Sequence, residues 1–308
     1  MKKLTLKEQS ILNNESKIIK AIEAEDAFDK VEDIVSFLKE NKLSVGYTKG
    51  ATANVFTNYV LGLSHINPLE YGLISERGYL QRRHNGHIVP NQYKPFFGIL
   101  LDKESYKKTQ EYLKANKITK AILEFHNIDI YYDKRLDAIK NHKKYTFREL
   151  SKLAINRNDS SSIFTINDFN DFIAVHAFKK SEGLEDYWFQ ELSCNSYNSL
   201  VNKFSFLKTK NMFNVILFQE EWMMMMKKIT GMSYLEINMF RLAAGRKIKL
   251  KGFEQELAHN LKEKYKISGK EFRQVYDTLL SCVCYLPCKA NIISDAYIEL
   301  VSNMNNKE

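Results

Sequence analysis

Apolar residues recur at helical spacing in the first forty positions of the chain. This pattern predicts one or two amphipathic helices within residues 15–42, which lead into a short apolar piece at Val45. Residues 46–51 break the periodicity and predict a loop. Residues 52–63 return to helical spacing, and the pair Asn67-Pro68 predicts the end of that helix, because a residue before proline is pushed out of the α conformation.

Two later segments have the apolar, β-branched and aromatic content of strands, namely Phe96 to Leu101 and Ala121 to Tyr132. Residues 103–116 between them have helical spacing, so the order strand, helix, strand predicts a small α/β unit. Only four prolines and twelve glycines punctuate the 308 residues, which favours long helices over a β-sandwich or barrel. We therefore predict a helix-rich α+β protein with a small mixed sheet.

A polar stretch at residues 157–162 is the best candidate for a linker. It divides the chain into residues 1–158, an α/β domain with N-terminal helices, and residues 159–308, a helical domain. Within the second part, only the apolar piece Val215 to Phe218 departs from helical spacing.

The composition is that of an ordinary globular protein. No stretch approaches the roughly 20 uncharged apolar residues that a membrane span needs, and the N-terminus lacks the apolar core of a signal peptide, so we expect a cytoplasmic protein without membrane partners. Its few cysteines do not form a secreted disulfide framework, and reduced thiols are the favoured state. A zinc site is the weaker alternative because the spacing of its ligands would be irregular; they would be Cys194, Cys282, Cys284 and Cys288.

The net charge of +9 is concentrated in two segments. Residues 77–120 carry ten Lys or Arg against three acids, and residues 241–289 carry eleven against five. Clustered cations gain affinity for nucleic acid by releasing phosphate counterions, so the distribution predicts localised basic faces of a kind that can bind DNA. The alternative is that these charges belong to solvated helix faces with no partner.

A motif at residues 45–53, Val-Gly-Tyr-Thr-Lys-Gly-Ala-Thr-Ala, is followed by Leu-Gly-Leu-Ser at 61–64, Asn-Pro-Leu at 67–69 and Ile-Ser-Glu-Arg at 74–77. It resembles the palm entry of bacterial replicative DNA polymerase III α subunits, the C family, where a Gly-Arg-Gly-Ser loop opens a helix. Small residues in such a loop let backbone N–H groups approach a triphosphate. The resemblance implies a nucleotidyltransferase-like palm and a phosphate cradle formed by Lys49, Gly50 and Ala51.

Two further blocks resemble the fingers of the same family. The first runs from Phe213 to Glu221 and continues through residues 231–234 and 240–247, and the second is Tyr-Leu-Pro-Cys-Lys at 285–289. The resemblance implies that nucleotide contacts come from Arg241, Arg246, Lys247 and Lys289. From the basic segment 77–120 we expect DNA contacts by Arg77, Arg82, Arg83, Lys107 and Lys108.

The family polymerises with two metal ions held by three palm aspartates, because paired cations must neutralise the triphosphate. In this chain Phe96 and Gly98 stand at two of the three ligand positions, while Asp129 resembles the third. One carboxylate cannot hold two magnesium ions, and the interval between Leu101 and Asp129 is too short for the family's thumb. The resemblance therefore implies a polymerase without metal, cofactor or catalytic residues.

An alternative set of metal ligands consists of Asp102 and Glu104, provided that the fold brings them to Asp129. The competing interpretation is that Asp102 and Glu104 are N-terminal helix residues that complement the helix dipole. The first hypothesis for function is thus a degenerate α-subunit-like protein that acts in DNA replication or its control by binding DNA, nucleotide or replisome proteins. The second is a minimal magnesium-dependent polymerase or nucleotidyltransferase, and the third is a decoy or inhibitor of a host replisome.

Overall fold

The computed structural model describes residues 4–79, 83–84, 87–88, 95–139, 142, 144–156, 164–181, 196–245 and 251–303. Contacts divide the chain into two units: Met1–Leu153 with Ile293–Glu308, and Ala154–Ile292. The sequence had placed all of 159–308 in one domain. The end of the chain instead returns to the first unit, because side chains of the last helix bond to residues 48, 135 and 145.

The first unit begins with two helices, α1 (Leu6–Ala21) and α2 (Glu25–Glu40), so the pair predicted within residues 15–42 is confirmed with an earlier start. A reciprocal capping box between Thr5 and Glu8 explains that start. Four residues of α2 are almost fully enclosed at helical spacing and form one side of the core, Val31, Ile34, Val35 and Leu38.

A three-stranded mixed sheet crosses the first unit in the order β1 (Thr48–Lys49), β4 (Phe97–Leu101) and β5 (Ile128–Tyr132). Strand β1 is antiparallel to β4, and β4 is parallel to β5. The crossover between the parallel strands contains α5 (Lys103–Ala115) and α6 (Lys120–Phe125). The predicted strand, helix, strand order and the helix-rich α+β class are therefore confirmed.

The sequence prediction for Ala121 to Tyr132 was wrong in its first half, which forms α6. The Thr119 side chain accepts a hydrogen bond from the Ile122 N–H and starts this helix, in which Ala121, Ile122, Leu123 and Phe125 are apolar. Likewise, the predicted helix 52–63 is divided by the extended Val55 into a 3-10 turn, η1 (Gly50–Asn54), and a short helix, α3 (Phe56–Leu61).

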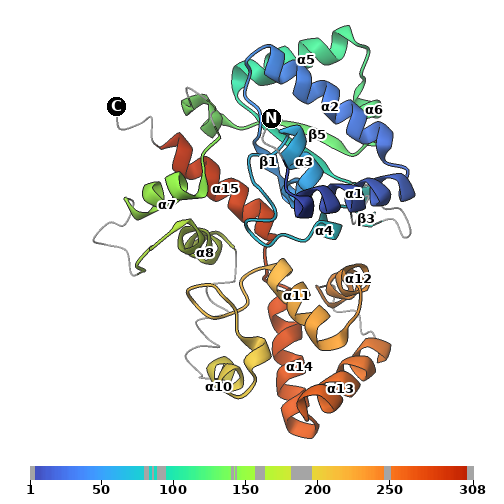
Figure 1. Ribbon diagram of the computed structural model, residues 1–308, viewed down its shortest axis with the longest axis vertical. Helices are drawn as coiled ribbons and strands as arrows, with labels where there is room; N and C mark the ends of the chain where they lie inside the picture. The colour runs from blue at the N-terminus through green and yellow to red at the C-terminus, as the bar shows by residue number, and fades with distance from the viewer. Residues whose placement is uncertain are drawn as a thin grey trace. The chain divides into compact units, whose positions relative to one another are not determined.

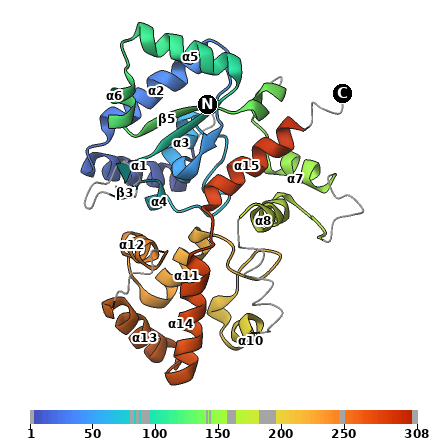
Figure 2. The same ribbon diagram turned by 180° about the vertical axis from the view of Figure 1, so that it is seen from behind.

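One face of the sheet packs on α2 and α5, which lie side by side in Figures 1 and 2. Phe97, Ile99 and Leu101 point into this core. The rings of Phe37 on α2 and Tyr112 on α5 stack with their centroids 4.2 Å apart. Because side chains alternate along a strand, Gly98 and Leu100 face the opposite side of the sheet.

The remaining elements of the first unit are short. They are α4 (Glu76–Tyr79), the hairpin β2 (Arg83–His84) with β3 (His87–Ile88), and η2 (Lys134–Ala138). Helix α7 (Phe147–Ile155) ends just past the division between the units, and α15 (Lys289–Ser302) begins just before the second division.

The second unit consists of helices in its described part: α8 (Phe169–Lys180), α10 (Ser196–Lys203), η3 (Ser205–Leu207), α11 (Gln219–Thr230), α12 (Tyr234–Gly245), α13 (Lys251–Tyr265) and α14 (Gly269–Val283). Trp222 on α11 is completely enclosed, and its indole N–H donates to the Leu279 carbonyl at 2.8 Å. Among the helices that the structure describes in either unit, none is long and apolar enough to cross a lipid bilayer.

Candidate functional site

Three residues singled out by the sequence lie in one row across the sheet of the first unit. Lys49 on β1 pairs with Gly98 on β4, and Gly98 pairs with Asp129 on β5. Residues in one row point to the same face of a sheet, so Lys49 and Asp129 flank Gly98 on the face opposite the core. This row brings together the predicted phosphate cradle and the predicted third metal ligand.

The turn after Lys49 is fixed to strand β4 by the hydroxyl of Thr52. This hydroxyl lies 2.9 Å from the Lys49 carbonyl and 3.1 Å from the Phe96 carbonyl, and it accepts a hydrogen bond from the Gly98 N–H at 2.8 Å. Thr52 is completely buried, so this connection is shielded from water. Sequence reasoning missed Thr52, and the signal was its place two residues after a glycine, where a hydroxyl can bond back to the turn.

The ring of Phe96 covers the glycines of this site. A Cβ added at Gly50 would lie 3.0 Å from the ring, and a Cβ added at Gly98 would lie 2.9 Å from it. The Gly98 position is also closed by the backbone, since the same Cβ would lie 2.8 Å from the Lys49 carbonyl oxygen. An acidic side chain at position 98 therefore has no room in this arrangement.

Asp129 already has a partner on its own strand. The Tyr131 hydroxyl donates to Asp129 Oδ2 at 2.7 Å, and burial together with this bond raises the pKa of Tyr131 to about 12. The ammonium of Lys49, which is exposed, lies 4.4 Å from the centre of the Tyr131 ring. A cation, a phenol and a carboxylate thus meet on one partly open face, an arrangement that can hold the phosphate of a ligand through Lys49.

Asp102 lies at the other end of strand β4 from this row. Because Gly98 is the register partner of Asp129, Asp102 is displaced from Asp129 by about 13 Å along the strand direction. Its carboxylate caps α5, accepting from the Ser105 N–H and the Ser105 hydroxyl at 2.8 Å each, and it faces His142 Nε2 at 3.2 Å. Asp102 and Glu104 therefore lie at the N-terminus of α5, as the competing interpretation predicted, and Asp102 is in addition its capping residue.

Burial raises the pKa of Asp102, but hydrogen bonds from His142, Ser105 and Ser44 outweigh it and hold the pKa well below its usual range. Glu104 is exposed and pairs with Lys108 one turn further along α5, at 2.7 Å. The structure does not bring Asp102 and Glu104 to Asp129. Within the described residues, no group of three or more His, Cys, Asp or Glu side chains is placed to hold a metal ion.

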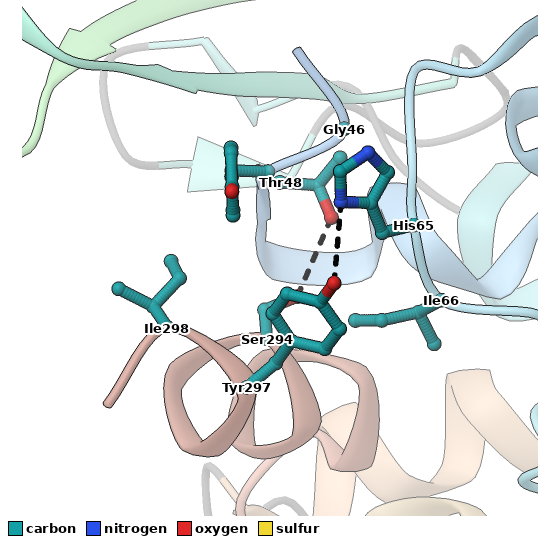
Figure 3. A pocket seen from close by; sticks show the side chains of 8 residues that line it. Gly46, Thr48, His65, Ile66, Ser294, Tyr297 and Ile298 are labelled. Carbon is teal, nitrogen blue, oxygen red and sulfur yellow. Dashed lines mark hydrogen bonds between the residues drawn. The ribbon is translucent and has the colours of Figure 1, made fainter. Parts of the chain in front are cut away.

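The C-terminal part of α15 forms a second small site against the strand that carries the cradle (Figure 3). Thr48 Oγ1 lies 3.3 Å from Ser294 Oγ, and the Tyr297 hydroxyl lies 3.4 Å from His65 Nδ1. These residues line a cavity of about 10 Å³, room for a single water-sized group. Gly46 is required there, because a Cβ would lie 2.0 Å from the His65 ring.

His65 is half-buried in this cluster, and desolvation lowers the pKa of its imidazole to about 3. A neutral imidazole is consistent with its place among aromatic rings, 5.2 Å from Tyr47 and 5.9 Å from Tyr297 between centroids. Sequence reasoning did not connect these residues, since more than two hundred positions separate His65 from Tyr297.

The predicted DNA-contacting residues of the first unit differ in their exposure to solvent. Lys107 and Lys108 are exposed on α5, while Arg77 is half-buried in α4. Arg83 is described only through its backbone, in β2, and Arg82 lies outside the described residues.

Two of the predicted nucleotide contacts of the second unit, Arg241 and Lys289, lie in its described part, and only Arg241 is buried. Arg241 is 8% exposed, and its Nε donates to Asn238 Oδ1 at 3.1 Å. The backbone N–H of Lys289 donates to the buried carboxylate of Glu220 at 2.8 Å. Arg246, Lys247 and Cys194 lie outside the described residues. Cys282, Cys284 and Cys288 form no disulfide with any described residue.

Comparison with known proteins gives matches to one group. Residues 1–86 match the family described as the bacterial DNA polymerase III alpha NTPase domain. The DNA polymerase III subunit alpha of Staphylococcus epidermidis is 39% identical over 66 residues, and that of Staphylococcus aureus is 35% identical over 66 residues. Each alignment spans 21% of this chain and 6% of the relative. The first residues of the chain, which include the cradle, are therefore similar to part of the α subunit.

Proposed function

We propose that this chain is a polymerase-derived protein that acts in DNA replication or its control by binding DNA, a nucleotide or replisome proteins, without polymerising DNA. The proposal rests on one observation, the row Lys49, Gly98 and Asp129 with the Phe96 ring beside it. Its basic and backbone elements suit a phosphate ligand, whereas only one carboxylate remains where two metal ions would need several. The protein then needs no metal or cofactor.

Similarity to DNA polymerase III subunit alpha over residues 1–86 supports the link to replication. Under this proposal the first unit is a reduced palm and the second a fingers-like helical domain. The exposed Lys107 and Lys108 supply phosphate contacts, and Lys49 supplies the charge at the cradle.

DNA affinity tests the binding role. Fluorescence anisotropy with a duplex oligonucleotide, measured over a series of salt concentrations, is expected to show binding that weakens as salt rises. The double variant Lys107→Glu/Lys108→Glu is expected to reduce the salt slope by about 2, one counterion contribution for each lost contact. Lys17→Glu/Lys20→Glu on the exposed face of α1 makes the same change in charge and is expected to leave the slope unchanged. Absence of DNA binding at low salt contradicts the DNA-binding form of the proposal.

A primer-extension assay with magnesium tests the loss of polymerisation. No extension is expected from the full-length chain. Extension that disappears in Asp129→Ala would show instead that the minimal nucleotidyltransferase hypothesis is correct. The separation of Asp102 and Glu104 from Asp129 disfavours that hypothesis, because paired metal ions require ligands within a few ångströms of each other.

A further inference from the structure

Strand β5 forms an edge of the three-stranded sheet. The sheet order places β4 on one side of β5, and no described strand lies on the other. In a parallel ladder, each strand turns the N–H and C=O groups of alternate residues towards its neighbour. The hydrogen bonds from Phe97 N–H to Asn127 O and from Asp133 N–H to Leu101 O show which alternate residues of β5 face β4. Asp129 and Tyr131 face β4, so Ile128, Ile130 and Tyr132 turn their backbone groups outwards.

The outward groups have no hydrogen-bond partner within the part of the chain that the structure describes. An edge of this kind is a template for an added strand, and many proteins blunt it with proline or lysine in the strand itself. The sequence Ile-Asp-Ile-Tyr-Tyr at 128–132 contains neither. Two large aromatic side chains flank the edge and are exposed, Phe125 at 57% and Tyr132 at 45%.

A hollow of about 500 Å³ adjoins this edge, between β5, α5 and α6. Ile128, Asp129 and Ile130 are consecutive and all line it, as expected where a strand presents its edge and not one face. Lys114, Lys117 and Lys120 stand around the hollow.

Two of these cations are available to a ligand. Lys120 pairs with Glu124 at 3.5 Å, and the carboxylate of Asp129 accepts from Tyr131. The side chains of Lys114 and Lys117 are exposed and make no ion pair with any described residue. The edge therefore combines free backbone groups at strand spacing with uncompensated positive charge.

We propose that the β5 edge binds an acidic, extended segment of a partner protein by strand addition. The partner's backbone pairs with Ile128, Ile130 and Tyr132, and its carboxylates meet Lys114 and Lys117. Nucleic acid fits the charge but not the edge, because its backbone offers no alternating donors and acceptors at the spacing of every second residue in a strand. Asp129 is shared by the hollow and by the row Lys49, Gly98 and Asp129, but the edge proposal does not depend on DNA binding.

Fluorescence anisotropy with a labelled peptide, Glu-Val-Asp-Val-Glu-Val-Asp, tests the proposal on the full-length chain. Binding is expected, and Lys114→Glu/Lys117→Glu is expected to weaken it at least tenfold. Lys17→Glu/Lys20→Glu makes the same charge change away from the hollow and is expected to have no effect. The same peptide with alternate amides N-methylated is expected to bind at least tenfold more weakly, because it cannot complete the ladder.

A variant in the edge strand provides a second, independent test of the proposal. Ile130→Pro removes one outward N–H, and proline is tolerated on an edge strand where that group faces away from the ladder. It is expected to abolish peptide binding while circular dichroism stays unchanged. If this variant misfolds, the N-methylated peptide still decides the outcome.

Four results would overturn the proposal. The first is equal binding of the plain and N-methylated peptides, and the second is no measurable peptide binding. The third is that a 20-nucleotide oligothymidylate displaces the peptide, and that Lys114→Glu/Lys117→Glu weakens the binding of this oligonucleotide. Sedimentation showing a dimer that Ile130→Pro dissociates would assign the edge to a second copy of the chain and would also overturn it.

Discussion

At the scale of single residues, position 98 is the most constrained point of the candidate site. The nearest atoms to an added Cβ belong to the Lys49 backbone and to the Phe96 ring, and only the ring can move away. The side chains at positions 96 and 98 are therefore coupled, because the phenylalanine at 96 fills the space that a side chain at 98 would need.

This coupling predicts the result of a double-mutant cycle. Gly98→Ala is expected to lower the free energy of unfolding by about 1–3 kcal/mol through overpacking. In a Phe96→Ala background the same change should cost at least about 0.5 kcal/mol less, because one of the two collisions is gone. Urea unfolding followed by circular dichroism measures both costs.

Gly252→Ala serves as the matched control for this cycle. An added Cβ there meets no atom within 4 Å, and the residue is helical, so alanine is expected to be neutral or stabilising by up to about 1 kcal/mol. Equal costs of Gly98→Ala with and without the Phe96 ring would contradict the coupling.

Asp102 provides a prediction about pH. Its pKa is lowered in the folded state, so its ionised form contributes stability that is present above the unfolded pKa, near 4, and is lost as pH falls towards the folded value. Asp102→Asn retains a good capping residue but removes the charge. We expect the difference in unfolding free energy between wild type and Asp102→Asn to be largest at pH 7 and to shrink below about pH 4. A difference that stays constant from pH 7 to pH 3 would contradict this.

The sequence predicted some of these residues well and others poorly, for physical reasons. Asp102 was predicted as a residue at the start of a helix because the signals for helix starts are local. Thr52 and His65 were missed as structural residues, since their partners lie on segments that only the fold brings together. The burial of Arg241 was likewise invisible in a basic run, because charge patterning cannot distinguish a buried guanidinium from an exposed one.

At the scale of elements, α1 and α3 are joined by one carboxylate. Glu15 of α1 is 1% exposed, and it accepts hydrogen bonds from the Phe56 N–H at 2.9 Å and the Thr57 N–H at 2.7 Å. It thereby satisfies the first free N–H groups of α3, which no residue of its own segment caps. Desolvation raises the pKa of Glu15 despite these bonds.

Glu15→Ala is expected to destabilise the first unit by about 2–3 kcal/mol, because it leaves two N–H groups buried without acceptors. Lys17→Ala, on the exposed face of the same helix, should change the free energy of unfolding by less than about 0.5 kcal/mol. Urea titration of both variants provides the comparison, and similar midpoints for the two would show that Glu15 is not the cap.

The raised pKa of Glu15 also determines how its contribution to stability changes with pH. An acid whose folded pKa lies above its unfolded value contributes stability below the unfolded pKa and loses it as pH rises through the folded one.

The sequence predicted helices well wherever the apolar periodicity was long, as in α2 and α5. It failed at α6, because a short helix with four apolar residues out of six cannot be told from a strand by its composition.

At the scale of the whole molecule, residues at the two ends of the sequence build one unit. Tyr297 is 3% exposed, and its hydroxyl accepts a hydrogen bond from the Tyr145 N–H at 3.0 Å. Asp295 pairs with Arg135, which is also held by Asp133. No pattern in the sequence indicates this return, because the apolar spacing of α15 fits a helix of either unit.

Removing the Tyr297 side chain is expected to lower the unfolding free energy of the first unit by about 3 kcal/mol, the usual cost of deleting a large buried ring. Tyr285→Ala, at a tyrosine that is 40% exposed, should cost less than about 1 kcal/mol. Hydrogen exchange of peptides from the sheet measures the effect, and unchanged protection in Tyr297→Ala would contradict the assignment of α15 to the first unit.

The return of α15 has a consequence for biosynthesis. A ribosome makes residues 1–153 first, at roughly 5–20 residues per second, but the segment that completes their unit follows only after the next 139 residues, 154–292, have been made. The nascent first unit therefore waits for many seconds with the surface around Tyr47 and His65 uncovered. A chaperone that shields this aromatic surface during translation would meet its client in that interval and be displaced by the arriving helix.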